Sequence, residues 1–346
     1  MNSLERVMRT LQFEEPDRVP VYPLVAGVTR KLVNATYHEW ATNADVAAEA
    51  YIRAADQYRL DAICTLIDLS VEAADFGAEL VYPENEAAHP NFDKPLMETA
   101  DDYLGLRPID PRQGTRMGEH IKLCQRLVQA KGDTLPIIAF VFGPLGILSM
   151  LRGQAALFMD LMLEPKPVKY AAAAITETLL EYIDALIDTG VHAVMLDTLF
   201  ASKSIMGKSM WLEFEGAYVK KLANHIHGRN CMVMVHNCGN GNYFDAQIET
   251  MQPEAISFLH LPDDVVSPSQ LKEKYGRTTA LIGHIDPTWV AGASEAEVRA
   301  ECQKQLDWYK KGGGFILATG CEYPANASLR SAEIIVETAE TYGVYR

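Results

Sequence analysis

The sequence lacks three features that would place it in other classes of protein. No apolar run reaches the roughly 18 to 20 residues needed to span a bilayer, so no membrane partner is expected. The segment from Met1 to Phe13 has no apolar core of a secretory signal, which predicts a cytoplasmic location. Lys and Arg number 31 against 46 Asp and Glu, a net charge of −15. That balance argues against a nucleic-acid groove, because phosphate binding needs a positive field.

Cysteine is also sparse, with six in 346 residues. Without a secretory signal, a disulfide framework is not expected in a chain of this length. Four of the six lie inside apolar strand-like or helical patterns and are expected to be small buried residues: Cys64, Cys124, Cys231 and Cys302. Cys238 and Cys321 differ, because each follows a predicted strand and sits among Gly and polar residues.

Short apolar runs alternate with longer amphipathic stretches along the chain. Hydrophobic residues make up 48% and charged residues 22%, as in a packed globular protein. The apolar runs predict eight strands: Val19–Pro23, Leu60–Ile67, Pro136–Phe142, Val191–Asp197, Cys231–His236, Ala255–His260, Thr279–Gly283 and Gly314–Thr319. Apolar residues at three- and four-residue spacing predict helices between them, most clearly at Pro167–Thr189, Ser209–His227, Ser294–Lys311 and Ser328–Tyr342.

Eight strands separated by helices predict an α/β fold of the (β/α)8 TIM-barrel type. We expect one domain over residues 1–346, with an insertion around 81–111 that is rich in Pro, Asn and Asp. The alternative is an open doubly wound sheet, which normally has a Gly-rich phosphate loop after its first strand. Here that position reads Leu24-Val25-Ala26-Gly27-Val28, which is not such a loop.

Reactive side chains gather where the predicted strands end, which is the active face of such a barrel. Every strand but the third ends in, or is followed by, titratable side chains: Tyr22, Asp68, Asp197, His236, Cys238, His260, His284, Asp286, Cys321 and Glu322. Strands of any parallel sheet end in polar residues. The concentration of His and Cys is less expected, and it points to chemistry at this face.

His236-Asn237-Cys238 is a His-x-Cys pair at the end of the fifth predicted strand. Residues two apart in a strand point to the same side, so both side chains can reach one ion. Cys321 follows the eighth strand, which lies across the barrel mouth from the fifth. One imidazole and two thiolates suit Zn²⁺, and three protein ligands leave a position open, as in catalytic sites. Taken alone, His-x-Cys is more typical of a core cysteine beside a hydrogen-bonded histidine, and the placement of Cys321 on the same face is what favours the metal.

Two further histidines are candidates for this face. His260, at the end of the sixth strand, is a candidate fourth zinc ligand or a satisfied polar residue at the rim. His284 lies in Gly283-His284-Ile285-Asp286-Pro287, where we expect Asp286 to cap backbone N–H groups in a turn. His284, and Tyr22 at the end of the first strand, are the candidates for contacting a bound cofactor.

Four short fragments occur in a recognisable order: Pro16-Asp17-Arg18-Val19-Pro20-Val21, Phe142-Gly143-Pro144-Leu145, Gly283-His284-Ile285-Asp286-Pro287 and Ala318-Thr319-Gly320-Cys321-Glu322. They resemble the uroporphyrinogen decarboxylase superfamily, and the resemblance covers nearly the whole chain. It implies a (β/α)8 barrel, in agreement with the strand count.

The superfamily has two branches with different chemistry. Its tetrapyrrole decarboxylases carry an Arg-Gln-Ala-Gly-Arg type segment after the first strand. In this chain the first arginine of that segment is absent, and the second is displaced to Arg30 or lost. Without those guanidinium groups, the several carboxylates of a tetrapyrrole would be poorly compensated.

The other branch comprises corrinoid-dependent methyltransferases, including the methylcobamide:coenzyme M methyltransferases. Its mark is His-x-Cys, a long gap and a further Cys, which His236, Cys238 and Cys321 match. The segment Asp68-Leu69-Ser70-Val71-Glu72-Ala73 also resembles that branch. Members with a glutamate zinc ligand place it near the end of the sixth strand. This chain has His260 there, so either His260 replaces the glutamate or water or substrate holds the fourth position.

The resemblance implies a zinc-dependent methyltransferase that works with a corrinoid protein as its partner. A methyl group would move between methylcobalamin or a related corrinoid and a small donor or acceptor, with a zinc-bound thiol favoured. Asp197 or Asp68 would orient a ligand or the His236 ring, unless both simply cap the following helices. Two alternatives remain: a metal-free decarboxylase, and a non-catalytic barrel that binds a corrinoid or tetrapyrrole.

Overall fold

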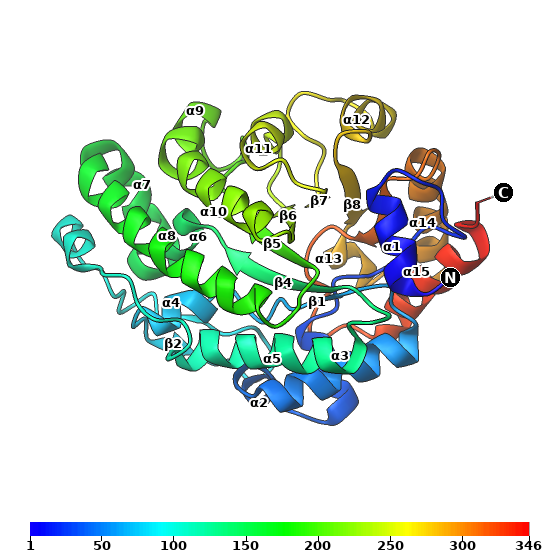
Figure 1. The fold of residues 1–346 in the computed structure, drawn as a ribbon, viewed down its shortest axis with the longest axis horizontal. Helices are drawn as coiled ribbons and strands as arrows, with labels where there is room; N and C mark the ends of the chain where they lie inside the picture. Colours follow the sequence, from blue (N-terminus) through cyan, green and yellow to red (C-terminus); the bar gives the residue numbers. More distant parts are fainter. Residues whose placement is uncertain (346) are drawn as a thin grey trace.

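A curled parallel β-sheet forms the centre of the molecule. The computed structural model describes residues 1–345. Among these residues, seven parallel strands pair in the order β1-β4-β5-β6-β7-β8-β9, and helices surround them (Figure 1). The strands are β1 (Ile63–Cys64), β4 (Ile137–Phe142), β5 (Ala193–Asp197), β6 (Met232–Asn237), β7 (Ala255–Phe258), β8 (Ala280–Ile285) and β9 (Phe315–Thr319). Seven of the eight predicted strand positions are therefore confirmed.

The predicted first strand, Val19–Pro23, is the exception. It forms no strand and meets β9 through a single parallel bridge between Val21 and Leu317. On its other side, the Val21 carbonyl accepts a hydrogen bond from the backbone N–H of Asp61 at 2.9 Å. Pro20 and the proline that ends the segment have no N–H to donate, so the ladder does not extend beyond the bridge. The prediction of a regular strand is wrong here, although the segment does lie between β9 and the chain leading into β1.

Helices alternate with the strands, as the apolar spacing predicts. They are α3 (Ala44–Tyr58), α5 (Thr115–Lys131), α8 (Pro165–Ile187), α10 (Ala217–Gly228), α11 (Phe244–Met251), α12 (Pro268–Tyr275), α14 (Glu295–Tyr309) and α15 (Leu329–Tyr342). Ser294 begins α14 with a capping box to Glu297, and Ser328 caps the first turn of α15. The predicted helix at 209–227 is divided into α9 (Lys208–Trp211), the π-helical turn η3 (Leu212–Gly216) and α10.

Further helical elements lie in the connections between these helices and the strands or near the chain ends. They are α1 (Ser3–Leu11), η1 (Gly27–Val33), α2 (Tyr37–Thr42), α4 (Val71–Asp75), α6 (Pro144–Arg152), α7 (Gln154–Leu163) and α13 (Pro287–Val290). No single helix among the described residues is long and apolar enough to cross a membrane; α6 and α7 meet that test only as a pair, bent by 111°.

The segment around 81–111 has little regular structure. It contains a two-stranded antiparallel pair, β2 (Leu80–Val81) with β3 (His89–Pro90), and the 3₁₀ helix η2 (Ala100–Gly105). It packs on α6 and α7, where the Tyr103 hydroxyl donates to Asp160 at 2.9 Å. A buried hydroxyl bonded to a carboxylate fixes the segment against the helices that follow β4.

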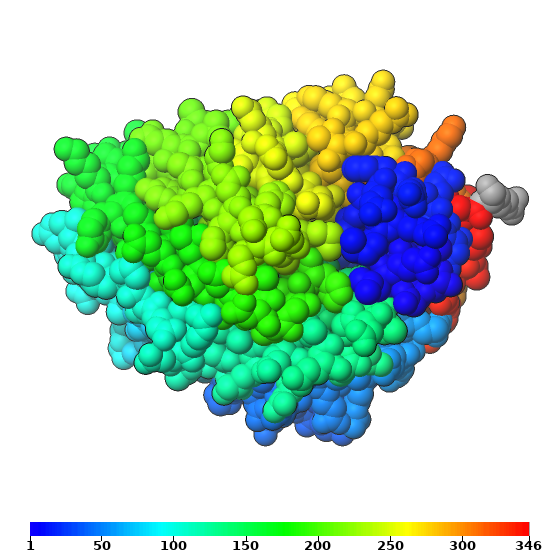
Figure 2. All heavy atoms as spheres, in the orientation of Figure 1, coloured from blue at the N-terminus to red at the C-terminus, as the bar shows by residue number. Residues whose placement is uncertain are grey.

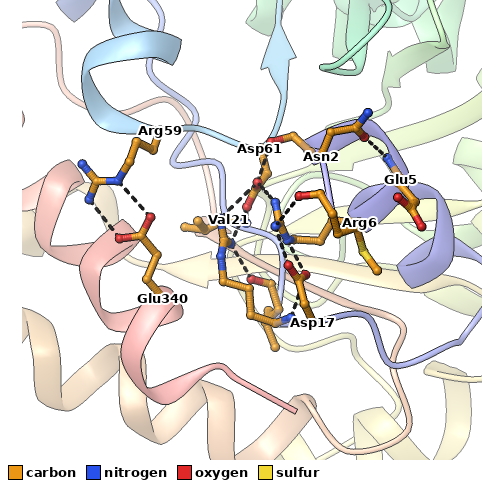
Figure 3. Close-up of polar contacts among 12 residues, drawn as sticks. Asn2, Glu5, Arg6, Asp17, Val21, Arg59, Asp61 and Glu340 are labelled. Carbon is orange, nitrogen blue, oxygen red and sulfur yellow. Dashed lines mark hydrogen bonds and ion pairs between the residues drawn. The ribbon is translucent and has the colours of Figure 1, made fainter.

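A network of buried charges closes the end of the sheet where the strands begin (Figure 3). The Asp61 carboxylate is 1% exposed and accepts hydrogen bonds from Arg6 at 2.8 Å and Arg18 at 2.6 Å. It also accepts the backbone N–H of Val21 at 2.8 Å. Helix α1 thus covers this end, and Figure 2 shows it in blue beside the C-terminal segment in red. Asp61 ties α1, the first segment and β1 together.

Candidate metal centre

His236 lies near the carboxyl end of β6. Its register neighbours are Asp197 on β5 and Ser257 on β7. Residues in register on parallel strands present their side chains on the same face of a sheet. The His236 side chain is therefore flanked on both sides by polar groups, and the residue is only 2% exposed.

The turn after β6 holds Cys238 in place. The side-chain amide of Asn237 donates to two carbonyl groups of the loop after β5, and its oxygen accepts the N–H of Gly239 at 2.9 Å. A Cβ atom at position 239 would lie 2.4 Å from the Ser202 hydroxyl, so only glycine fits there. The chain consequently turns sharply, and Cys238 remains half-buried beside His236.

A second tight turn places Cys321 after β9. The Thr319 hydroxyl donates to the Cys321 carbonyl at 2.8 Å, and the N–H of Gly320 donates to the Ile285 carbonyl at 2.8 Å. A Cβ atom at position 320 would lie 2.6 Å from the Leu259 Cα atom. The close backbone approach explains the glycine and fixes the direction in which the Cys321 side chain leaves the strand.

These two turns bring the three predicted ligands together. One ligand atom each from His236, Cys238 and Cys321 lies within 4.8 Å of the other two. In the part of the chain that the structure describes, the only comparable group is a largely exposed trio of aspartates. The remaining four cysteines are buried and free, as the sequence predicts. The structure therefore gathers residues that are 83 positions apart in the chain, counting from 238 to 321.

The three groups strongly perturb one another. Hydrogen bonds from Cys238 and His236 hold the pKa of the Cys321 thiol well below its usual range. The hydrogen bond with Cys321, followed by burial and by the charge on Cys321, raises the pKa of Cys238. Burial alone would lower the pKa of His236, but Cys321 and Asp197 outweigh it and raise that pKa. A site that stabilises a thiolate beside an imidazole is suited to a cation that binds sulfur.

Two residues that the sequence did not single out fix the His236 ring. Its Nδ1 atom lies 3.0 Å from the Ser257 hydroxyl. The ring centroid of Phe140, on β4, lies 5.7 Å from that of the imidazole. Ser257 had a detectable signal, because it is the single polar side chain in the apolar run Ala255–Phe258. Phe140 had none, since an aromatic residue in a buried strand is ordinary.

Asp197 and Asp68 have different surroundings. Asp197 lies beside the His–Cys group, where burial raises its pKa to about 6, and one of its oxygens accepts the Leu199 N–H at 2.9 Å. It makes no hydrogen bond to the His236 ring. Asp68 is buried in an ion pair with Arg116 and accepts the N–H of Ser70 at 2.8 Å. The structure therefore brings only Asp197 to the candidate centre.

His260 does not join the group. Strand β7 ends at Phe258, so His260 falls two residues beyond it, in the loop. It lines a surface pocket with His284 and Asp286, and it is absent from the cluster of ligand atoms around Cys321. His260 thus lies outside the cluster because β7 ends before it, and Ser257 holds the β7 position in register with His236.

His284 and Tyr22 both pack against neighbouring side chains, and His284 also lines the surface pocket beside His260. The His284 ring stacks on Phe258 with 5.0 Å between centroids, and its Nε2 atom lies 3.2 Å from the Tyr309 hydroxyl on α14. Burial lowers the pKa of His284 to about 4, so the ring is neutral. Asp286 caps α13, as predicted. Tyr22 is 3% exposed, and burial followed by the nearby Cys64 raises its pKa well above the usual value.

Two buried glutamates that the sequence did not assign hold the turn after β4. Glu72 accepts the N–H of Phe142 at 3.1 Å, and Glu215 accepts the N–H of Leu145 at 3.2 Å. Burial raises the pKa of each carboxyl to about 8. Because these side chains satisfy backbone donors at the rim, their first role is to fix the loop next to Asp197.

Comparison with known proteins agrees with this architecture. The family model described as uroporphyrinogen decarboxylase (URO-D) matches residues 2–342. The chain belongs to the uroporphyrinogen decarboxylase family. Similar curated proteins are the uroporphyrinogen decarboxylase of Mannheimia succiniciproducens, 24% identical over 98% of this chain and 97% of that protein, and that of Bordetella petrii, 28% identical over 77% and 74%.

Solved structures extend the comparison to the fold. A methyltransferase from Methanosarcina mazei superposes with a TM-score of 0.83 over 98% of both chains, at 19% identity. A B12-independent methionine synthase from Shewanella reaches a TM-score of 0.55 over 94% of this chain and 93% of its own, at 14% identity. At such identities the likeness concerns the fold of this member of the uroporphyrinogen decarboxylase family.

Proposed function

We propose that this protein is a zinc-dependent methyltransferase that moves a methyl group between a corrinoid on a partner protein and a small thiol. The observation that carries the proposal is the meeting of His236, Cys238 and Cys321 within 4.8 Å. Membership of the uroporphyrinogen decarboxylase family and the likeness to a Methanosarcina mazei methyltransferase support it. The proposal includes a closed (β/α)8 barrel, with the Val21 segment in the eighth strand position.

The three side chains fit zinc by their chemistry and spacing. Zn²⁺ binds Cys sulfur at about 2.3 Å and His nitrogen at about 2.0 Å, so tetrahedral ligand atoms lie roughly 3.5 to 3.8 Å apart. The three ligand atoms lie within 4.8 Å of one another, which is compatible with that spacing. Hard cations such as Mg²⁺ prefer oxygen ligands, which this group does not offer. Three ligands leave one position for a substrate.

The bound metal would hold the sulfur of a small thiol and favour its deprotonated form near neutral pH. His236, Cys238 and Cys321 would supply the ligands and set their orientation. Two thiolates offset the charge of Zn²⁺, so an added thiolate would keep electron density for attack. In the overall reaction a sulfur–carbon bond forms and the carbon–cobalt bond breaks, with its electron pair left on the corrinoid. The thiol proton leaves when the sulfur binds.

The rest of the site would prepare this reaction. Asp197, with its pKa raised to about 6, lies where it can accept the proton that the thiol releases. Phe140 and Phe142, whose ring centroids are 5.3 Å apart, line the sheet interior beside His236 and would keep water from the sulfur. The corrinoid would approach the strand ends, which is the face at which barrels of this type bind ligands.

Uroporphyrinogen decarboxylation is the second candidate, because the curated relatives carry that name. It is less well supported by the residues that would hold a tetrapyrrole. Arg30 is 4% exposed, and its guanidinium donates hydrogen bonds to the carbonyls of Gly27 at 3.0 Å and Ala325 at 2.9 Å. A guanidinium engaged in this way has little left to offer a substrate carboxylate.

Elemental analysis of the purified protein and of Cys238→Ser tests the proposal first. We expect about one zinc per chain in the wild type and a large loss in the variant. Cys231→Ser is the matched control, since Cys231 is a free, buried cysteine outside the cluster. Methyl transfer from methylcobalamin to small thiols is then measured with the same three proteins. A wild type that binds no zinc would refute the proposal and favour the decarboxylase reading.

A further inference from the structure

His236 has two ring nitrogens, and the surroundings of the ring decide which one is available to a metal. Nδ1 lies 3.0 Å from the Ser257 hydroxyl, and both residues are 2% exposed. A histidine that binds a metal usually donates its other N–H to an oxygen, which fixes the tautomer and the ring orientation. In this chain a serine hydroxyl is the oxygen within hydrogen-bonding distance of the ring.

The neighbouring groups do not compete for that nitrogen. Asp197 is the register neighbour on the other side, but its carboxylate accepts a hydrogen bond from the backbone N–H of Leu199. Phe140 offers only a ring face, at 5.7 Å between centroids. Ser257 is held on β7 in register with His236, so the backbone of the sheet itself sets the distance between hydroxyl and imidazole.

From this geometry we infer that Ser257 is a positioning residue for the metal centre: it holds the Nδ1–H of His236 and thereby directs Nε2 to the metal. The inference rests on the proposed zinc site. It follows that the ligand set contains a neutral imidazole supported by a neutral hydroxyl. A carboxylate partner would make the imidazole more basic and the metal less electrophilic, so the serine keeps the metal able to attract a thiol.

Metal affinity measures this role directly. Zinc dissociation constants are obtained by competition with a chromogenic chelator for the wild type, Ser257→Ala and Ser257→Thr. We expect Ser257→Ala to bind zinc about 10- to 100-fold more weakly, while still reaching one zinc per chain at saturation. Ser257→Thr keeps the hydroxyl and is expected to restore most of the affinity. Ser149→Ala is the control, because Ser149 is a buried serine that donates to the Gly146 carbonyl, away from the ring.

A spectroscopic measurement on the wild type needs no variant. In protein loaded with ¹¹³Cd and labelled with [¹⁵N]histidine, scalar coupling to cadmium identifies the ligating nitrogen of the one coordinating histidine. We expect coupling to Nε2 and a proton on Nδ1. Coupling to Nδ1, or equal zinc affinities of wild type and Ser257→Ala, would overturn the positioning role and leave the zinc site standing. Absence of zinc and cadmium binding in the wild type would instead refute the proposed function.

Discussion

The two ends of the sheet use buried polar groups in opposite ways. Where the strands begin, Asp61 is 1% exposed and every one of its contacts is complementary, with Arg6, Arg18 and the Val21 N–H all donating to it. Where the strands end, His236, Cys238 and Cys321 lie close together, with Ser257 and Asp197 beside the imidazole. The first arrangement is complete as it stands, whereas the second is the one that we propose a cation completes.

Under the proposed function, this contrast divides stability and chemistry between the two ends of the sheet, as (β/α)8 barrels commonly do. Removing one partner of a buried ion pair is strongly destabilising, because the other charge is left buried without compensation. Titratable groups that are held close together in a buried site have perturbed pKa values, and such groups are typical of sites that bind a ligand. Variants at the two ends should therefore separate the free energy of unfolding from the response to zinc.

The largest effect is expected from Asp61→Ala. Removing this carboxylate leaves Arg18 without a carboxylate partner and Arg6 with Asp17 alone, which should cost up to about 3 to 5 kcal/mol of unfolding free energy. Urea denaturation measures the loss, and zinc stoichiometry of the folded protein should be unchanged. Glu340→Ala is the control, because its ion pair with Arg59 is half-exposed and should contribute about 1 kcal/mol or less. Equal losses in the two variants would contradict the view that Asp61 closes this end.

Cys321→Ser tests the other end. Zinc at about one hundred times its dissociation constant should stabilise the wild type by about 2.7 kcal/mol, and it should not stabilise the variant. In the presence of a chelator, we expect the two proteins to unfold within about 1 kcal/mol of each other, since the cysteine is half-buried and serine is nearly isosteric. Urea denaturation with zinc and with chelator gives the four values. A variant that zinc still stabilises fully would show that Cys321 is no ligand.

The separation of the two ends was only partly visible in the sequence. Apolar runs predicted the seven paired strands, because burial on both faces leaves a continuous apolar signature. The bridge at Val21 was predicted as a full strand, since the pattern records hydrophobicity and underestimates what two prolines remove from a ladder. The buried role of Asp61 was not predicted. It depends on Arg6 and Arg18, which only the fold brings near.

The residues of the candidate centre were likewise predicted only in part. His236, Cys238 and Cys321 were predicted together because strand ends of a barrel converge, and the structure confirms that they meet. His260 was placed with them because the predicted strand ran two residues too far. Strand boundaries are set by hydrogen bonds to neighbouring strands, which a single sequence does not contain. Glu215 was missed because it reaches the rim from η3, a turn that no local pattern marks.

A smaller effect is expected from Glu72→Gln, whose carboxyl lies at the end of β4 close to the candidate centre. Burial raises the pKa of Glu72 from 4.5 to about 8, so the folded protein keeps a proton that the unfolded chain releases in this range. The stability due to this group is therefore present below about pH 4.5 and is lost as the pH rises toward 8, by at most about 1.4 kcal/mol per pH unit. The unfolding free energy of the variant should therefore fall less steeply with rising pH than that of the wild type.

Urea denaturation at about pH 5.5 and about pH 7.5 compares the slopes of wild type and Glu72→Gln. Glu215 shifts in the same direction and remains in the variant, so part of the slope should persist. Glu249→Gln is an exposed control on α11 that should match the wild type. Equal slopes in the wild type and in Glu72→Gln would contradict the raised pKa of Glu72. They would mean that the Glu72 carboxyl is ionised in the folded protein and that its hydrogen bond with the Phe142 N–H outweighs its burial.

The smallest effect is expected from His260→Ala, and it decides how far the metal centre extends. The imidazole lies in the loop beyond β7 and shares a surface pocket with His284 and Asp286, so it should not contribute to metal binding. Zinc affinity by chelator competition should stay within about twofold of the wild type, or roughly 0.4 kcal/mol. The Ser257→Ala variant, changed three positions earlier, provides the contrast. A loss of tenfold or more in His260→Ala would mean that this loop moves inward on metal binding and brings a fourth protein ligand to the ion. The position left for substrate would then be closed, and the centre would be better described as structural than as catalytic.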